Sequence, residues 1–173
     1  LRIKLQGESH IDTLSARRDL SDINIRAGDF KKGIDLMVKN VSLSSNKFGI
    51  NSKQTINAKL RLAFLYLGEQ NYRKALPITI ENYNSTQKVF GKKSEEFITS
   101  AINLASIYER LNQFLKAKKY GEEAYEISLK VYGKNKAAKK LYWTLYTIYS
   151  QFDDQKSLAK LEDNLSPDQS DFD

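Results

Sequence analysis

The sequence predicts an all-helical protein built from stacked helical hairpins. The first observation is a ladder of four glycines, each 42 residues after the one before it: Gly7, Gly49, Gly91 and Gly133. Alignment on these glycines brings further columns into register, namely Leu20, Leu62 and Leu104; Ser21, Ala63 and Ala105; Phe30, Tyr72 and Phe114; and Gly33, Ala75, Ala117 and Ala159. A constant period over the whole chain is the signature of a repeat architecture, in which each unit buries its apolar face against its neighbours.

Each repeat contains two predicted helices. The first, residues 55–67, has the three-four spacing of an amphipathic helix, with apolar side chains at Ile56, Leu60, Ala63, Phe64 and Leu67. Turn residues occupy 68–71, and a second helix is predicted over 72–90. Gly91 then fits the position after a helix end, where a left-handed backbone costs little without a Cβ atom.

Helix starts are predicted two residues after the glycines. Ser9, Asn51 and Asn135 can accept a hydrogen bond from a free amide there. The residues Asp12, Gln54 and Glu96 lie three positions further on, as a capping box requires.

Small residues mark where the two helices of a hairpin approach closely. Ala63 and Ala75 are twelve residues apart, as are Ala105 and Ala117, so each pair is expected to meet across the turn. Pro77 falls inside the predicted second helix, where it removes one backbone hydrogen bond. A local kink or a looser first turn is expected there.

The domain organisation follows from the period. A single domain is expected over residues 1–165, made of the end of a preceding helix (1–6), three full repeats (7–48, 49–90, 91–132) and a closing repeat (133–165). Residues 166–173 are expected to form a disordered acidic tail. Because residues 1–6 match the end of a second helix, the chain is expected to begin inside a repeat of a longer protein.

The composition excludes several kinds of chemistry. One histidine and no cysteine provide no material for a zinc site, thiol chemistry or a histidine-based triad. The glycines are spaced and not clustered, so no phosphate loop is present. No enzyme and no cofactor are therefore expected, and His10 is expected to act at a helix start.

Charge and hydropathy argue against nucleic-acid and membrane partners. The net charge of +7 is spread along the chain and interleaved with acids. This pattern is typical of a solubilising surface and not of a nucleic-acid footprint. No run of 18 apolar residues exists, so no membrane span is expected. The absence of cysteine favours a cytoplasmic setting.

Three segments resemble the tetratricopeptide repeat, in the 42-residue variety typical of kinesin light chains. They are Gly7-Glu8-Ser9-His10, Ala75-Leu76-Pro77-Ile78 and Asn103-Leu104-Ala105-Ser106-Ile107-Tyr108. Asp19 and Asn24 depart from the usual asparagine and tyrosine in the first repeat. The resemblance implies an α-solenoid with a right-handed superhelical course, and a concave groove that binds a peptide or protein segment.

The resemblance also implies which residues line the groove. They lie at one stripe of each first helix: Ser15, Asp19, Asp22 and Arg26; Asn57, Arg61, Phe64 and Gly68; and Thr99, Asn103, Ser106 and Arg110. The family's asparagine at the place of Asn103 holds the backbone of an extended peptide. The arginines could pair with acidic side chains.

The fourth repeat breaks the polar pattern. In the register of the glycine ladder its stripe is Leu141, Leu145, Ile148 and Phe152. A helix that is apolar all round should be buried, so these residues are a candidate apolar interface covered by a second copy or by another part of the parent chain. The alternative function is therefore a regulatory or oligomerisation segment of a larger protein, such as an effector, a peptidase or a signalling ATPase.

Overall fold

The computed structural model describes residues 7–133 and 136–165. These residues form eight α-helices and no strand: α2 (Ile11–Arg26), α3 (Phe30–Phe48), α4 (Lys53–Gly68), α5 (Tyr72–Phe90), α6 (Glu95–Arg110), α7 (Phe114–Tyr132), α8 (Lys136–Gln151) and α9 (Gln155–Leu165). The predicted all-α class is confirmed. The predictions on residues 1–6 and 166–173 lie outside the described residues.

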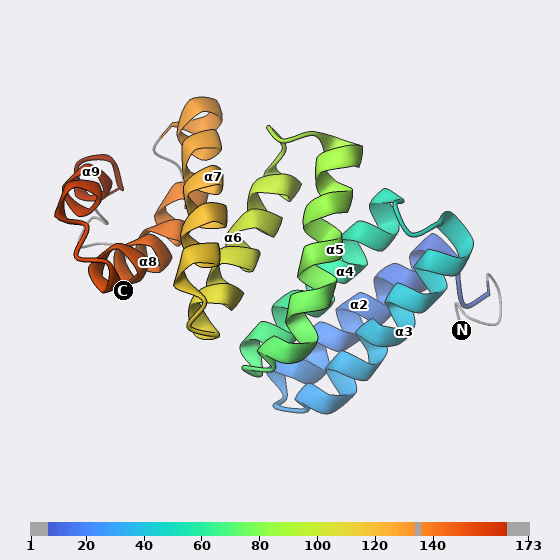
Figure 1. The fold of residues 1–173 in the computed structure, drawn as a ribbon. Helices are drawn as coiled ribbons and strands as arrows, with labels where there is room; N and C mark the ends of the chain where they lie inside the picture. Colours follow the sequence, from blue (N-terminus) through green and yellow to red (C-terminus); the bar gives the residue numbers. More distant parts are fainter. Residues whose placement is uncertain (1–6, 134–135, 166–173) are drawn as a thin grey trace. The chain divides into compact units, whose positions relative to one another are not determined.

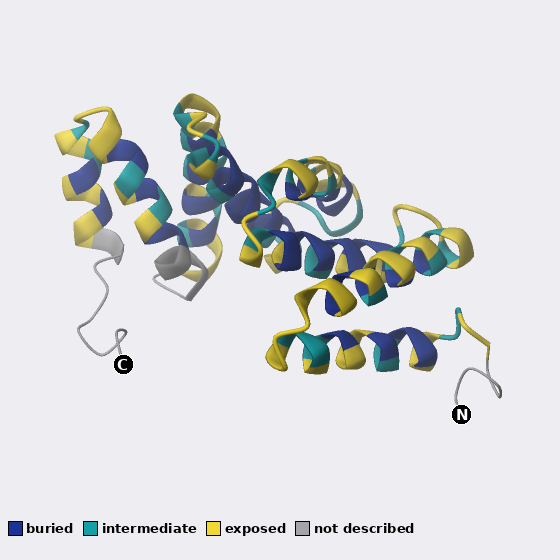
Figure 2. Cartoon of the chain, turned by 90° about the horizontal axis from the view of Figure 1, so that it is seen from below, coloured by how far each residue is buried: buried dark blue, intermediate teal, exposed yellow. Residues whose placement is uncertain are grey.

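The chain divides into two compact units, with the boundary between Ser85 and Thr86, inside α5. In the first unit, α2 and α3 form a hairpin and α4 packs against α3 (Figure 1). In the second unit, α6 and α7 form a hairpin, α8 packs on both of them, and α9 packs on α8. Along α2, the first described helix from the N label in Figure 2, the buried residues Thr13, Leu14, Arg17 and Ser21 are mostly polar.

The turn inside each hairpin has one backbone design. Gly28, Gln70 and Asn112 all have positive φ, at 84°, 57° and 57°. In the first hairpin the amide of Asp29 donates to the carbonyl of Asn24 at 2.9 Å. The same bond recurs in the next two hairpins, from Asn71 to Tyr66 and from Gln113 to Tyr108. This bond, which reaches back over the last turn, is the Schellman motif that satisfies the final carbonyls of a helix.

The glycine ladder ends the second helix of each repeat. Gly49 has φ 88° and ψ 156°, and its amide donates to the carbonyl of Ser45 at 3.0 Å. Gly133 has φ 65° and ψ −146°. The positive φ was predicted, but the extended ψ was not. This is the region that essentially only glycine occupies, and not the left-handed helical region that asparagine tolerates.

The helix starts lie one residue later than predicted. Ser52 and Ser94 are the N-caps of α4 and α6, and each side chain accepts a bond from the amide three residues on, at 3.2 Å and 3.1 Å. His10 caps α2 through Nδ1, which confirms its predicted role. Asn51 instead accepts a bond from Ser85 Oγ at 2.8 Å. The predicted caps Ser9 and Asn51, and the capping boxes built on them, are therefore wrong, while the predicted cap Asn135 lies outside the described residues.

Close approach of the two helices is confirmed in the first hairpin, while the meeting of Ala63 with Ala75 and of Ala105 with Ala117 stays a prediction. Four alanines of the small columns are at most 1% exposed: Ala63, Ala75, Ala105 and Ala117. In the first hairpin Ser21 Oγ donates to the carbonyl of Gly33 at 2.7 Å. A Cβ atom on Gly33 would lie 2.6 Å from Ile25 Cδ1. Pro77 lies within α5, which runs on to Phe90.

The fourth hairpin is offset by one residue from the glycine ladder. The first residues of α4 and α6, Lys53 and Glu95, are separated by the same spacing as the ladder glycines. The first residue of α8, Lys136, comes one residue earlier than this spacing predicts. The residue of positive φ in its turn, Asp153, is likewise one position early when compared with Asn112. Since helix start and turn agree, the connection from α7 to α8 is one residue shorter than its counterparts. Ala159, predicted for the small column, is accordingly exposed.

Candidate functional site

The first helix of the second repeat, α4, has one accessible stripe. Its other sides are buried, including Ile56, Ala58, Leu62, Ala63, Leu65 and Tyr66. Asn57, Phe64 and Gly68 are exposed, and Arg61 is half-buried between them. All four predicted positions on α4 therefore share the face that α4 leaves accessible.

Arg61 is held in place by α2 and by its own helix. Its Nε donates to Asp22 Oδ1 at 3.1 Å, and its Nη2 bonds to the same oxygen. The guanidinium carbon lies 5.4 Å from the ring centroid of Phe64. The structure thus brings together three predicted site residues, Asp22, Arg61 and Phe64. Arg26 is exposed at the end of α2.

The predicted stripe of α6 is less accessible. Asn103, the predicted peptide-binding asparagine, is only 5% exposed. Thr99 and Ser106 are half-buried, and Ser106 Oγ lies 3.2 Å from Thr144 Oγ1 of α8. Arg110 is exposed, and its Nε lies 3.5 Å from a carboxylate oxygen of the neighbouring Glu109.

The apolar stripe predicted for the fourth repeat is largely core. Leu141, Leu145 and Ile148 are fully buried, and Phe152 is 43% exposed. Leu145 packs over Gly121 of α7, where an added Cβ atom would lie 2.9 Å from Leu145 Cδ2. Three of the four residues are therefore packing positions of the second unit and not an exposed interface.

The physical reason is the offset of α8. Matched by distance from the helix start, Leu145, Ile148 and Tyr149 correspond to the buried Leu104, Ile107 and Tyr108 of α6. The equivalents of Asn103, Ser106 and Arg110 then become Thr144, Thr147 and Gln151, which are half-buried or exposed. The polar pattern continues on α8. Leu145, Ile148 and Tyr149 follow Leu104, Ile107 and Tyr108 by one residue less than the glycine period. This shorter spacing is the sequence signal that could have predicted the accessible residues of α8.

Two structural tests limit the chemistry of the described residues. Among residues 7–133 and 136–165, no group of three or more histidines, cysteines, aspartates or glutamates could hold a metal ion. No helix in this part of the chain has the length and apolar character needed to span a bilayer. Among the described residues, the pKa with the largest shift is that of Tyr149, and packing explains it. Burial raises this pKa, and the Tyr149 hydroxyl donates to Glu122 Oε1 at 3.2 Å.

Comparisons with known proteins agree with the repeat architecture. A family model described as tetratricopeptide repeat matches residues 54–130. A search of curated proteins returned no match. Among solved structures, the chain is similar to BtubC (BKLC) from P. vanneervenii, with a TM-score of 0.77 and 18% identity over 87% of this chain and 61% of that one. The chain thus spans less than two thirds of the length of that protein.

Two crystal structures of a candidate kinesin light chain from Podosopora anserina, with nearly identical TPR-like repeats, are also similar. One is a point variant, with a TM-score of 0.79 and 15% identity over 94% of this chain and 77% of that one. The other has a TM-score of 0.76 and 15% identity over 92% and 78%. At these identities the likeness shows the fold. Residues 54–130 therefore match the tetratricopeptide repeat, which generally mediates protein–protein interactions, and the chain has the fold of kinesin-light-chain-like repeat proteins.

Proposed function

We propose that this chain binds an extended peptide or protein segment on the accessible faces of the first helices of its repeats. In the first unit these faces belong to α2 and α4, and in the second unit to α6 and α8. The role is binding and not catalysis. The candidate stripe supplies amide, hydroxyl and guanidinium groups, which suit the backbone and acidic side chains of an extended segment.

One observation carries the proposal. α4 is buried on its other sides, yet its accessible stripe presents one arginine beside an amide and an aromatic ring, at Arg61, Asn57 and Phe64, and not the run of charged residues typical of a solvated face. Arg61 is also oriented by its bonds to Asp22, so less side-chain entropy is lost when a partner binds. Asn103 is 5% exposed and can contribute only the edge of its amide.

The test is a selection of random peptides displayed on phage, followed by affinity measurements on the selected peptides by fluorescence anisotropy. Arg61→Ala combined with Asn57→Ala is expected to weaken binding at least tenfold, since a hydrogen bond to a charged group is worth about 1.5–3 kcal/mol. Lys31→Ala is the matched control, because Lys31 is exposed on the second helix α3. Equal affinities of the double variant and the wild type would refute the proposal.

The alternative, a regulatory or oligomerisation segment, is favoured by a different observation. Leu20 and Ile23 of α2 are 46% and 62% exposed, whereas their equivalents on α4, Leu62 and Leu65, are each 4% exposed. Trp143 of α8 is 53% exposed. Sedimentation velocity on the wild type and on Leu20→Ser tests this reading, because self-association through this face should be weakened by the serine.

A further inference from the structure

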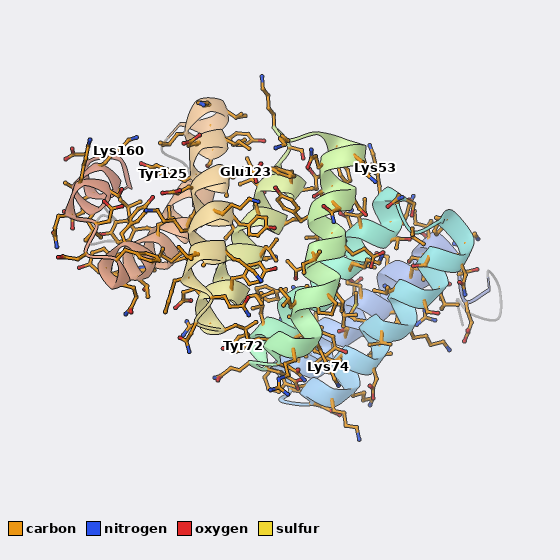
Figure 3. All side chains as sticks on the ribbon, viewed as in Figure 1. Lys53, Tyr72, Lys74, Glu123, Tyr125 and Lys160 are labelled. Atoms are coloured by element: carbon orange, nitrogen blue, oxygen red, sulfur yellow. The ribbon has the colours of Figure 1, made fainter. Side chains whose placement is uncertain are left out.

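A hollow of about 240 Å³ opens between α2, α3 and α4 of the first unit. It lies at the start of α4, just after Lys53, which Figure 3 labels at the end of the hairpin opposite Tyr72. We infer that this hollow takes one branched aliphatic side chain of a bound protein segment, while Arg18 at its rim pairs with an acidic group beside that side chain. The inference rests on the proposed function and specifies what the segment must contain.

The size and the lining fit an aliphatic side chain. Leu14, Met37 and Ala58 line the hollow, and they are 6%, 0% and 7% exposed. A cavity of about 150 Å³ is enough to hold benzene. The buried polar residues Asn40 and Ser44 also line it, so the lining is mixed, but a hollow of about 240 Å³ has room for a leucine-sized group against its apolar part.

The rim is polar, and the one charged side chain among its described lining residues is a cation that Asp19 already contacts. Ser15, Gln54 and Asn57 provide hydrogen-bonding groups, and Arg18 is the one charged side chain among the described residues that line the hollow. Arg18 is oriented by Asp19, whose Oδ1 accepts from Nε at 3.3 Å and from Nη2 at 3.1 Å. Since these bonds use Nε and Nη2, the Nη1 donors can meet a partner carboxylate without losing the existing contact. Charge complementarity therefore selects an acidic segment.

Position 58, which lines the hollow, carries a small residue. On α8 the residue at the same distance from the helix start is Leu141, and it is fully buried. On α6 the equivalent is Ser100, also fully buried. This fold thus accepts a leucine at the position that Ala58 occupies. Ala58→Leu is expected to fill the hollow with the chain still folded.

The direct test uses isocaproate, which joins a branched aliphatic chain to a carboxylate, on the full chain. Methyl resonances of Met37 and Leu14 are expected to shift in a saturable way at millimolar concentrations. Ala58→Leu should abolish these shifts, whereas Ala159→Leu, the same change at an exposed position, should preserve them. Circular dichroism melts of both variants establish that they are folded. Absent shifts in the wild type, or shifts that persist in Ala58→Leu, would overturn the inference.

The role of Arg18 is tested with the neutral analogue isocaproamide. Arg18→Gln is expected to weaken isocaproate by up to about fivefold and leave isocaproamide unchanged. Equal weakening of both probes would overturn the assignment of the acidic partner to Arg18.

The peptides selected for the proposed function separate the two ideas. Ala58→Leu should weaken peptides with a leucine or isoleucine beside an acid at least tenfold, and should not affect the same peptides with that side chain replaced by alanine. Peptides that require Arg61 but ignore Ala58→Leu would overturn the hollow as a subsite and leave the proposed function intact. Saturable isocaproate binding without any peptide that depends on Arg61 would overturn the proposed function but not the chemistry of the hollow.

Discussion

Replacement of Gly49 by alanine measures how much free energy a side chain costs in the backbone conformation that the ladder glycines adopt. Gly49 has φ 88° and ψ 156°. A Cβ atom built on it would meet no atom within 4 Å, so no steric clash contributes. Any loss of stability in Gly49→Ala must therefore come from the backbone conformation itself.

The expected magnitude combines two opposing effects. A residue other than glycine in this region is strained by about 1–3 kcal/mol. Alanine also lowers the entropy of the unfolded chain, which stabilises by about 0.4–1 kcal/mol. The net change expected for Gly49→Ala is a loss of about 1–2 kcal/mol. Gly68→Ala is the matched control, because Gly68 lies in α4 with an equally open Cβ position, and a gain of about 0.4–1 kcal/mol is expected.

Asparagine distinguishes the observed conformation from the one expected at a helix end. Asparagine tolerates the left-handed helical region, but a ψ of 156° lies outside it. Gly49→Asn is therefore expected to be as costly as Gly49→Ala. Gly28→Asn should be nearly neutral, because Gln70 and Asn112 occupy the equivalent position with φ 57°.

The assay is urea unfolding followed by far-ultraviolet circular dichroism, with the free energy of unfolding compared between variants of the same unit. Gly49, Gly68 and Gly28 all belong to the first unit. Opposite signs for Gly49→Ala and Gly68→Ala are the expected result. A neutral Gly49→Ala, or a clear rescue by asparagine, would refute the backbone argument.

Two further predictions concern the second unit. Ala117→Leu should lower the free energy of unfolding by about 1–3 kcal/mol through overpacking, whereas Ala159→Leu should change it by less than about 0.5 kcal/mol, because Ala117 is fully buried and Ala159 is exposed. Urea unfolding checks both, and equal losses would contradict the one-residue offset of the fourth hairpin. Burial raises the pKa of Tyr149 in the folded chain. Stability should therefore fall as pH rises above about 10, where the unfolded tyrosine ionises and the folded one does not. Tyr149→Phe should make this alkaline loss shallower by up to about 1.4 kcal/mol per pH unit, measured by urea unfolding across the alkaline range.

Most of the fold could be predicted from the sequence because its signals are local. The three-four spacing predicted residues 55–67 and 72–90 as helices, and the structure places α4 and α5 at Lys53–Gly68 and Tyr72–Phe90. The turn residues and the small columns also act within one hairpin. The N-caps were displaced by one residue, because serine and asparagine stand next to each other at 51 and 52 and either can cap a helix.

The candidate site was predicted in part. The four predicted positions on α4 are accessible, because α4 keeps the register of its own glycine, and their part in binding stays a prediction. The assignment on α8 was wrong, since the connection from α7 to α8 is one residue shorter than its counterparts. This difference comes after Gly133, so the spacing of the glycines does not reveal it. The hollow beside Ala58 could not be predicted, because it depends on how the side chains of three helices pack against one another.

The charges and the hollow of the first unit are expected to play unequal parts in binding. Arg18 and Arg61 already have carboxylate partners in Asp19 and Asp22, so a partner's acid must share these cations. An exposed ion pair contributes about 0.2–1 kcal/mol, and salt screens it. Complete burial of one leucine-sized side chain contributes about 1.5–3 kcal/mol. The hollow therefore contributes more to the affinity than the exposed Arg18, which sets the orientation of the segment and the rate of encounter.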